Sequence, residues 1–244
     1  MKAYLIKRSV MLVGILFGVL SITFFLTRVL PSSPVEMMLG AKPTAEQIAL
    51  AKIELGLDLP VWQQFISYLA SAITGDLGTS LRTGQEVTSD IISRMMATVE
   101  LVTISITISV LIGVPVGIWA AVKKNSAVDQ GARGVSVAGI AIPSFFLAII
   151  LQMIFYGGLG WFPLQGRIGA EVLLNSSYAP VTGFLLVDTL LAGDWVAFKS
   201  ALHHMVLPVM TLSLATFAIF VRTTRNLMVE VLSQDYVRTG KAFG

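Results

Sequence analysis

Few residues of this sequence have the types and spacing that catalysis requires. The segment from Gly78 to Gly84 lacks the spacing and the lysine of a phosphate-binding loop, so we do not expect this chain to hydrolyse ATP. No serine lies with a histidine and an acid in a recognisable nucleophile motif. The absence of cysteine excludes disulfides and thiolate zinc sites. The sequence therefore predicts no catalytic residue and no cofactor.

The two histidines are the remaining candidates for metal binding. His203 and His204 are adjacent, and adjacent side chains on a helix point about 100° apart rather than towards one ion. We interpret them as residues at the membrane interface or at the entry of a helix. A metal or proton-relay site is the less favoured alternative, so no metal site is predicted.

A second kind of chemistry is the handling of a solute inside a membrane. Glu100 is the one acid within or beside a long apolar stretch, where an ionisable group can mark a substrate path. We favour the alternative that its carboxylate reaches the membrane interface and pairs with Arg94. Proline within a membrane helix either opens a path by bending the helix or makes an ordinary kink. The candidate path or hinge residues are Glu100, Pro115, Pro143 and Pro208.

The carboxyl-terminal segment is a candidate docking element. Residues 235–244 read Asp-Tyr-Val-Arg-Thr-Gly-Lys-Ala-Phe-Gly. A short helix that carries Tyr236, Val237 and Phe243 beside basic residues, outside the bilayer, is typical of an element that binds a partner protein. The alternative is a solvated segment held by anionic lipid.

The elements that position these residues are membrane helices. The chain has 244 residues, of which 55% are hydrophobic and 13% charged, and its mean hydropathy is +0.81. A soluble domain carries about a quarter charged residues, so a soluble globular protein is excluded. Because a spanning helix needs about 20 apolar residues, the sequence predicts an all-α integral membrane protein. The predicted spans cover about 9–30, 97–122, 134–157 and 203–225, whereas polar residues, proline and glycine interrupt the stretch 173–187, which we interpret as a loop.

The distribution of charge predicts the orientation of these spans. With the amino terminus inside, the cytoplasmic segments hold ten Lys and Arg and three acids, and the outer loops hold six Lys and Arg and ten acids. This is the bias of the positive-inside rule, so both termini of the chain are predicted to be cytoplasmic. The extracytoplasmic loops are then about 31–96 and 158–202, and the cytoplasmic coupling segment is about 226–244. The net charge of +3 is explained by orientation, and no nucleic-acid partner is expected.

The first outer loop is predicted to be ordered and helical. Thr44 and Gln47 have the spacing of a capping box, and Pro60 precedes a second stretch with an apolar stripe. These helices are expected to lie on the membrane surface or to cap the bundle. Turns are predicted at Gly75, Asp76, Gly78 and Gly84. Within the spans, two pairs have the small-xxx-small spacing of closely packed helices, Gly14 with Gly18 and Gly113 with Gly117.

The tail resembles the permease subunits of binding-protein-dependent ABC importers of the dipeptide, oligopeptide and nickel group. Their cytoplasmic loop reads close to Asp-Tyr-Val-Arg-Thr-Ala-Arg-Ala-Lys-Gly, which residues 235–244 match except at Gly240, Lys241 and Phe243. Further segments resemble the group in the expected order: 55–60, 75–84, 112–117, 160–163 and 190–195.

The resemblance implies a fold, a site and partners. Such a permease has six helices and lies in the prokaryotic inner membrane. It pairs with a second permease, receives solute from an extracytoplasmic binding protein and uses cytoplasmic ATPase subunits. The tail would be the coupling helix, with the residues Asp235, Tyr236, Arg238, Thr239, Gly240, Phe243 and Gly244. Because Gly244 lies within the family's Glu-Ala-Ala-x-x-x-Gly motif, the chain resembles a partial permease with four of the six helices.

We interpret the chain as a permease subunit of an ATP-driven importer of peptides or a similar small solute, and not as an enzyme. One alternative is a secondary transporter driven by an ion gradient, disfavoured because Glu100 is the one acid at a span. The other is a membrane assembly fragment without transport activity. Peptide and nickel are not separated, because the binding protein makes that selection.

Overall fold

The protein is described by a computed structural model that covers residues 1–28, 44–54, 56–80, 82–176 and 178–243. These residues form helices, with one isolated β-bridge between Thr79 and Glu86 and no β-strand in the described ranges. The chain is an all-α integral membrane protein, as predicted. It divides into two compact units, Met1–Ser93 and Arg94–Gly244, which we describe separately.

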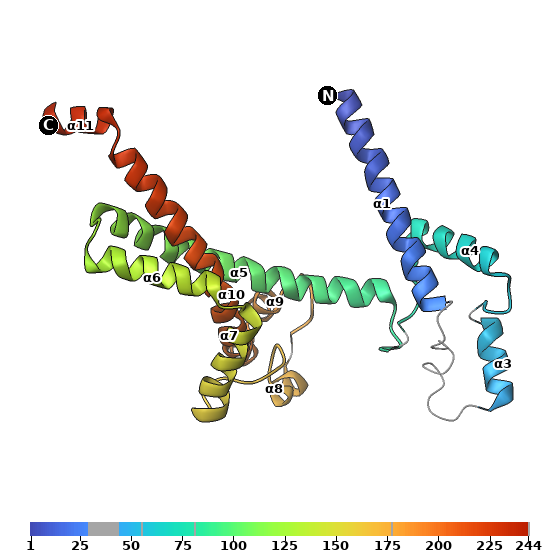
Figure 1. Ribbon diagram of the computed structural model, residues 1–244. Coiled ribbons are helices and arrows are strands. Elements are labelled where there is room, and N and C mark those ends of the chain that lie inside the picture. Colours follow the sequence, from blue (N-terminus) through green and yellow to red (C-terminus); the bar gives the residue numbers. More distant parts are fainter. Residues whose placement is uncertain (29–43, 55, 81, 177, 244) are drawn as a thin grey trace. The chain divides into compact units, whose positions relative to one another are not determined.

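The described residues of the first unit form three helices and the beginning of a fourth (Figure 1). Their bounds are α1 (Lys2–Arg28), α3 (Ala45–Glu54), α4 (Val61–Thr74) and α5 (Val87–Val122). The capping box is confirmed, since the Thr44 amide donates to Gln47 Oε1 (2.9 Å) and the Gln47 amide donates to Thr44 Oγ1 (3.3 Å). Pro60 precedes α4 and Gly75 ends it with a φ of 83°, so these sequence signals are confirmed too.

The apolar stripe of α4 packs against α1 through aromatic rings. The buried ring of Phe24 lies 5.1 Å from Phe65 and 5.7 Å from Tyr68, centroid to centroid. Phe17 also contacts Phe65, edge to face, at 6.0 Å. The apolar stripe of α4, expected to lie on the membrane surface or on the bundle, therefore covers one side of α1. Most other apolar side chains of α1 are exposed, as in a helix that faces lipid.

The second unit holds the remaining described helices (Figure 1). They are the rest of α5, then α6 (Ala127–Ala141), α7 (Ser144–Leu151), the π-helix η1 (Gln152–Gly158), α8 (Ala170–Asn175), α9 (Leu185–Leu191), α10 (Trp195–Leu232) and α11 (Asp235–Phe243). Three described helices are long and apolar enough to cross a membrane by themselves, namely α1, α5 and α10. The stretch 173–187, interpreted as a loop, also holds the end of α8 and the beginning of α9.

The predicted span 134–157 is divided at Pro143. The helices on either side of the break, Ala127–Ala141 and Ser144–Gly158, meet at an angle of 102°. Ile142 is extended, with φ −83° and ψ 119°, because the ring of a following proline disfavours the helical conformation. Pro115 and Pro208, by contrast, lie inside the continuous helices α5 and α10. Of the three candidate hinge prolines, Pro143 is the one at a break.

Small residues bring α5 and α6 close to α10. A Cβ atom on Gly117 would lie 2.8 Å from Thr224 Cβ and 2.9 Å from the Val221 carbonyl oxygen, and one on Gly139 would lie 2.8 Å from Ala218 Cβ. The close packing predicted for Gly113 and Gly117 is thus confirmed, with both glycines against α10. A Cβ atom added to Gly14 or Gly18 would have no described atom within 4 Å, so their spacing makes no such contact here.

Hydroxyl groups join α5 to α10 beside the glycines. The buried Ser109 Oγ lies 3.0 Å from the Ser213 carbonyl oxygen and 2.6 Å from Thr216 Oγ1. Ser213 Oγ in turn donates to the Ser105 carbonyl oxygen at 3.2 Å. Such polar contacts between apolar helices contribute to their register.

Candidate functional site

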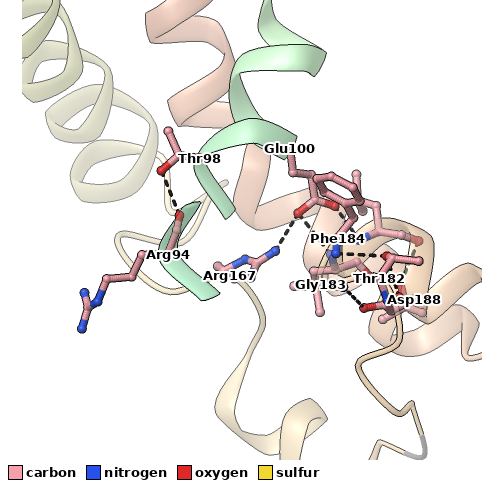
Figure 2. Close-up of polar contacts among 11 residues, drawn as sticks. Arg94, Thr98, Glu100, Arg167, Thr182, Gly183, Phe184 and Asp188 are labelled. Carbon is pink, nitrogen blue, oxygen red and sulfur yellow. Dashed lines mark hydrogen bonds and ion pairs between the residues drawn. The ribbon is translucent and has the colours of Figure 1, made fainter. Parts of the chain in front are cut away.

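Glu100 is buried at the centre of one polar cluster in the second unit (Figure 2). Its side chain is 5% exposed, and its Oε2 accepts a hydrogen bond from the Arg167 guanidinium at 2.7 Å. The backbone amides of Leu185 and Leu186, at the beginning of α9, donate to the same carboxylate at 3.2 and 2.7 Å. We call these four residues the Glu100 cluster. It joins α5, the segment after η1 and α9.

The predicted pairing of Glu100 with Arg94 is wrong. Figure 2 shows the Arg94 side chain directed away from the Glu100 carboxylate. Arg167 binds this carboxylate instead. The two arginines differ in sequence distance: Arg94 is six positions from Glu100, whereas Arg167 is 67 positions away. Two residues that are six positions apart lie on different faces of a helix, so Arg94 and Glu100 do not meet. Only the fold brings the distant Arg167 to the Glu100 carboxylate.

The turn before α9 is held by a second acid, Asp188. Its carboxylate accepts the Thr182 amide (2.8 Å), the Thr182 hydroxyl (2.7 Å) and the Gly183 amide (3.0 Å). Burial opposes ionisation of Asp188, but these hydrogen bonds outweigh it and lower the pKa of the carboxyl group below its usual value. Gly183 has a φ of 80°, and a Cβ there would lie 3.0 Å from Met96 Cγ on α5. The turn therefore fits closely against α5.

A second polar cluster lies at the beginning of α6. Asp129 is fully buried, and its two carboxylate oxygens accept Nε (2.8 Å) and a terminal nitrogen (3.1 Å) of Arg225 on α10. Arg133, one turn further along α6, donates at 3.0 Å, and the amide of Asn125 donates at 2.9 Å. We call Asp129, Arg225, Arg133 and Asn125 the Asp129 cluster. It ties the turn before α6, where Asn125 has a φ of 66°, to α10.

Sequence reasoning did not single out the Asp129 cluster. The spacing of Asp129 and Arg133 was a signal, because an acid and a base four residues apart share a helix face. The bidentate partner Arg225 lies 96 positions from Asp129, so no local pattern indicates it.

The candidate path residues are not gathered at one cavity. A hollow of about 410 Å³ lies between α5 and α10, lined by apolar side chains together with Ser109 and Ser213. None of Glu100, Pro115, Pro143 and Pro208 lines this hollow. The residues that line it come from α5 and α10.

The histidines make separate contacts. His203 Nε2 lies 2.7 Å from the Trp161 carbonyl oxygen, and His204 Nδ1 lies 2.7 Å from the Ser200 carbonyl oxygen. Their rings are nearly perpendicular, at 89°. Both lie in the third turn of α10, which begins at Trp195, and so not at the entry of the helix.

The carboxyl-terminal segment forms the short helix α11 and presents aromatic side chains. Tyr236 is 65% exposed and Phe243 is 89% exposed, and the two lie seven positions apart, on one face of the helix. Asp235, Thr239 and Gly240 belong to the same helix. The Arg238 side chain and Gly244 lie outside the described part of the chain.

The fold and these clusters define a helical membrane subunit with buried ion pairs and an amphipathic helix beyond its last long apolar helix. Residues 113–244 match the family model described as binding-protein-dependent transport system inner membrane component, and residues 1–102 match the model of its N-terminal part. The chain belongs to this family of transport proteins.

Similar proteins include permeases of several transport systems. The chain is 38% identical to the di/tripeptide transport system permease protein of Pseudomonas aeruginosa and 35% identical to the dipeptide transport system permease protein of Escherichia coli, in each case over all of this chain and 72% of the relative. It is 34% identical to a glutathione transport system permease protein of Escherichia coli, over all of this chain and 69% of the relative. The chain is thus a permease subunit of an ATP-driven importer and not an enzyme, and this class of transporter works with an ATPase and a binding protein.

Proposed function

We propose that this permease contributes to the path of small peptides and that α11 transmits the action of a cytoplasmic ATPase. The substrate class is supported by the relatives, whose names refer to dipeptides, di/tripeptides and glutathione. None of these three names refers to nickel, so peptide is the substrate that we propose. The coupling role rests on one observation, the exposed aromatic face of α11 formed by Tyr236 and Phe243.

The position of α11 suits a coupling role. Large aromatic side chains outside the bilayer favour a protein or lipid cover. Ser233 and Gln234 alone separate α11 from α10, which has 38 residues and is therefore about 57 Å long at 1.5 Å per residue. A force on α11 would pass directly into α10, which packs on α5 and α6 and carries Arg225. The proposed mechanism is alternating access, in which ATP-driven movement of α11 tilts α10, with a second permease as the other half of the path.

The proposed orientation places α11 and the Asp129 cluster in the cytoplasm. Five basic residues gather where α5 ends, α6 begins and α10 leaves its apolar stretch: Lys123, Lys124, Arg133, Arg222 and Arg225. This enrichment supports a cytoplasmic location under the positive-inside rule.

The absence of cysteine allows a clean test of this orientation. Lys124→Cys and Asn175→Cys each introduce a single thiol at an exposed position. In intact cells, a membrane-impermeant maleimide should label Asn175→Cys and leave Lys124→Cys unlabelled until the membrane is permeabilised. Labelling of Lys124→Cys in intact cells would reverse the proposed orientation.

The coupling role is tested by removing the aromatic anchor and the nearby positive charge. The double variant Arg238→Glu with Phe243→Ala should bind the ATPase about thirtyfold more weakly, since truncation of a central aromatic anchor costs about 2 kcal/mol or more. Recovery of the ATPase with the permease in one detergent measures this, alongside peptide uptake. Membrane insertion should be unchanged, because both positions lie beyond α10.

Phe145→Ala is the matched control, because Phe145 is similarly exposed but lies on α7. It should leave ATPase recovery unchanged. Equal recovery and full uptake with the double variant would refute the coupling role of α11. A tail covered by lipid would instead respond to the content of anionic lipid and not to the ATPase.

A further inference from the structure

A small hollow of about 220 Å³ lies between α6 and α10, beside the Asp129 cluster. Three arginines line it, Arg133 from α6 and both Arg222 and Arg225 from α10, together with Asn226. Val137 and Val221 form part of its wall. We call it the arginine pocket. None of the transport steps proposed above uses it.

The arginine pocket has an excess of positive charge. Three guanidinium groups line it, and the one carboxylate that binds two of them is Asp129. Among the described residues, the side chain of Arg222 makes no hydrogen bond and no ion pair. The planar guanidinium group of arginine suits the oxygens of a phosphate, which can accept two parallel hydrogen bonds from it. Arg222 is therefore available to an anionic ligand.

The pocket also lies where apolar sequence meets charged sequence. Arg222 directly follows the uncharged stretch 205–221 of α10, and Arg133 precedes the uncharged stretch 134–158 that begins in α6. In a membrane helix this position corresponds to the level of the lipid headgroups. Val137 is largely exposed beside the arginines. One side of the pocket thus offers cations, and the other offers an apolar surface.

We propose that the arginine pocket binds an anionic phospholipid, with the headgroup phosphate at Arg222 and Arg133 and an acyl chain along Val137. A basic pocket between membrane helices is a known type of site for anionic headgroups. Free phosphate shares the headgroup chemistry, but the apolar wall favours a ligand that also carries a hydrocarbon chain. The site is separate from the docking of α11, so it does not depend on the proposed function.

The test measures lipid binding to the purified full chain in detergent by native mass spectrometry. Phosphatidylglycerol should bind to the wild type, and Arg222→Gln should weaken that binding about fivefold, the effect expected for one basic residue at a membrane surface. Arg222→Lys should keep most of the affinity because it keeps the charge. Arg94→Gln is the matched control, since it removes the same charge at an exposed position near the beginning of α5, outside the arginine pocket, and it should bind as the wild type does.

Two comparisons on the wild type keep the proposal testable if Arg222→Gln does not fold. Phosphatidylcholine with the same acyl chains should bind more weakly than phosphatidylglycerol, and millimolar inorganic phosphate should not displace the lipid. Displacement by inorganic phosphate would identify a free-phosphate site and overturn the lipid assignment. Equal binding of both lipids, or equal weakening by Arg222→Gln and Arg94→Gln, would overturn the site itself.

Discussion

Replacing Arg225 with alanine is expected to destabilise the chain far more than replacing Arg133, although both arginines bind the carboxylate of Asp129. The Arg225 side chain is 15% exposed and contacts both carboxylate oxygens, whereas Arg133 is 51% exposed and contacts one. Loss of one partner from a buried ion pair costs about 3–5 kcal/mol, and we expect a loss of about 3 kcal/mol, the lower end of this range, because Arg133 and the Asn125 amide still donate to Asp129. A half-exposed pair contributes about 1 kcal/mol or less.

Thermal unfolding of the two variants in one detergent measures this difference. A loss of 3 kcal/mol corresponds to a fall in Tm of about 6–12 °C for a chain of this size. Arg133→Ala should lower Tm by only a few degrees. In an Asp129→Asn background, Arg225→Ala should cost much less, because the buried charge is already gone. Equal falls in Tm for Arg225→Ala and Arg133→Ala would contradict the unequal roles that the geometry gives them.

Replacing Glu100 with alanine is expected to release the beginning of α9 from α5. The change leaves the amides of Leu185 and Leu186 without their acceptor, and it removes the partner of Arg167. An unsatisfied buried donor costs about 1–3 kcal/mol. Hydrogen exchange at the Leu185 and Leu186 amides should therefore become roughly fivefold to a hundredfold faster, since 1.4 kcal/mol corresponds to a factor of ten.

Two further variants decide whether the effect belongs to the carboxylate. Glu100→Gln keeps one carbonyl oxygen as an acceptor and should show a smaller increase in exchange. Arg94→Ala removes the arginine that the sequence indicated as the partner, and it should leave the exchange rates unchanged. Faster exchange in Arg94→Ala and none in Glu100→Ala would refute the Glu100 cluster.

Local signals in the sequence predicted the local structure well. Thr44 and Gln47 sit in a capping box because their spacing determines their hydrogen bonds. The tail forms a short helix, as expected from its aromatic, apolar and basic residues. Prolines were harder to interpret, because the same residue type ends a helix at Pro143 and lies inside a continuous helix at Pro115. The residue type alone therefore does not tell the two outcomes apart.

The polar clusters were beyond sequence reasoning for a related physical reason. The fold determines which arginine binds each carboxylate. The arginine partner lies 67 positions along the sequence from Glu100 and 96 positions from Asp129. A single sequence shows which groups need partners when buried, but not which partners the fold supplies. The orientation of the spans and the roles of the α11 residues stay predictions that the experiments above address.

The glycine contacts of α10 have a mechanical consequence. Gly117 on α5 and Gly139 on α6 both meet α10 without a side chain of their own, so neither contact has interlocking side chains that resist shear. The ion pair between Asp129 and Arg225 and the hydrogen bonds that Ser109 makes with Ser213 and Thr216 tie α10 to α6 and to α5 instead. We therefore infer that a displacement of α11 moves α10 together with α5 and α6, rather than sliding α10 along its neighbours.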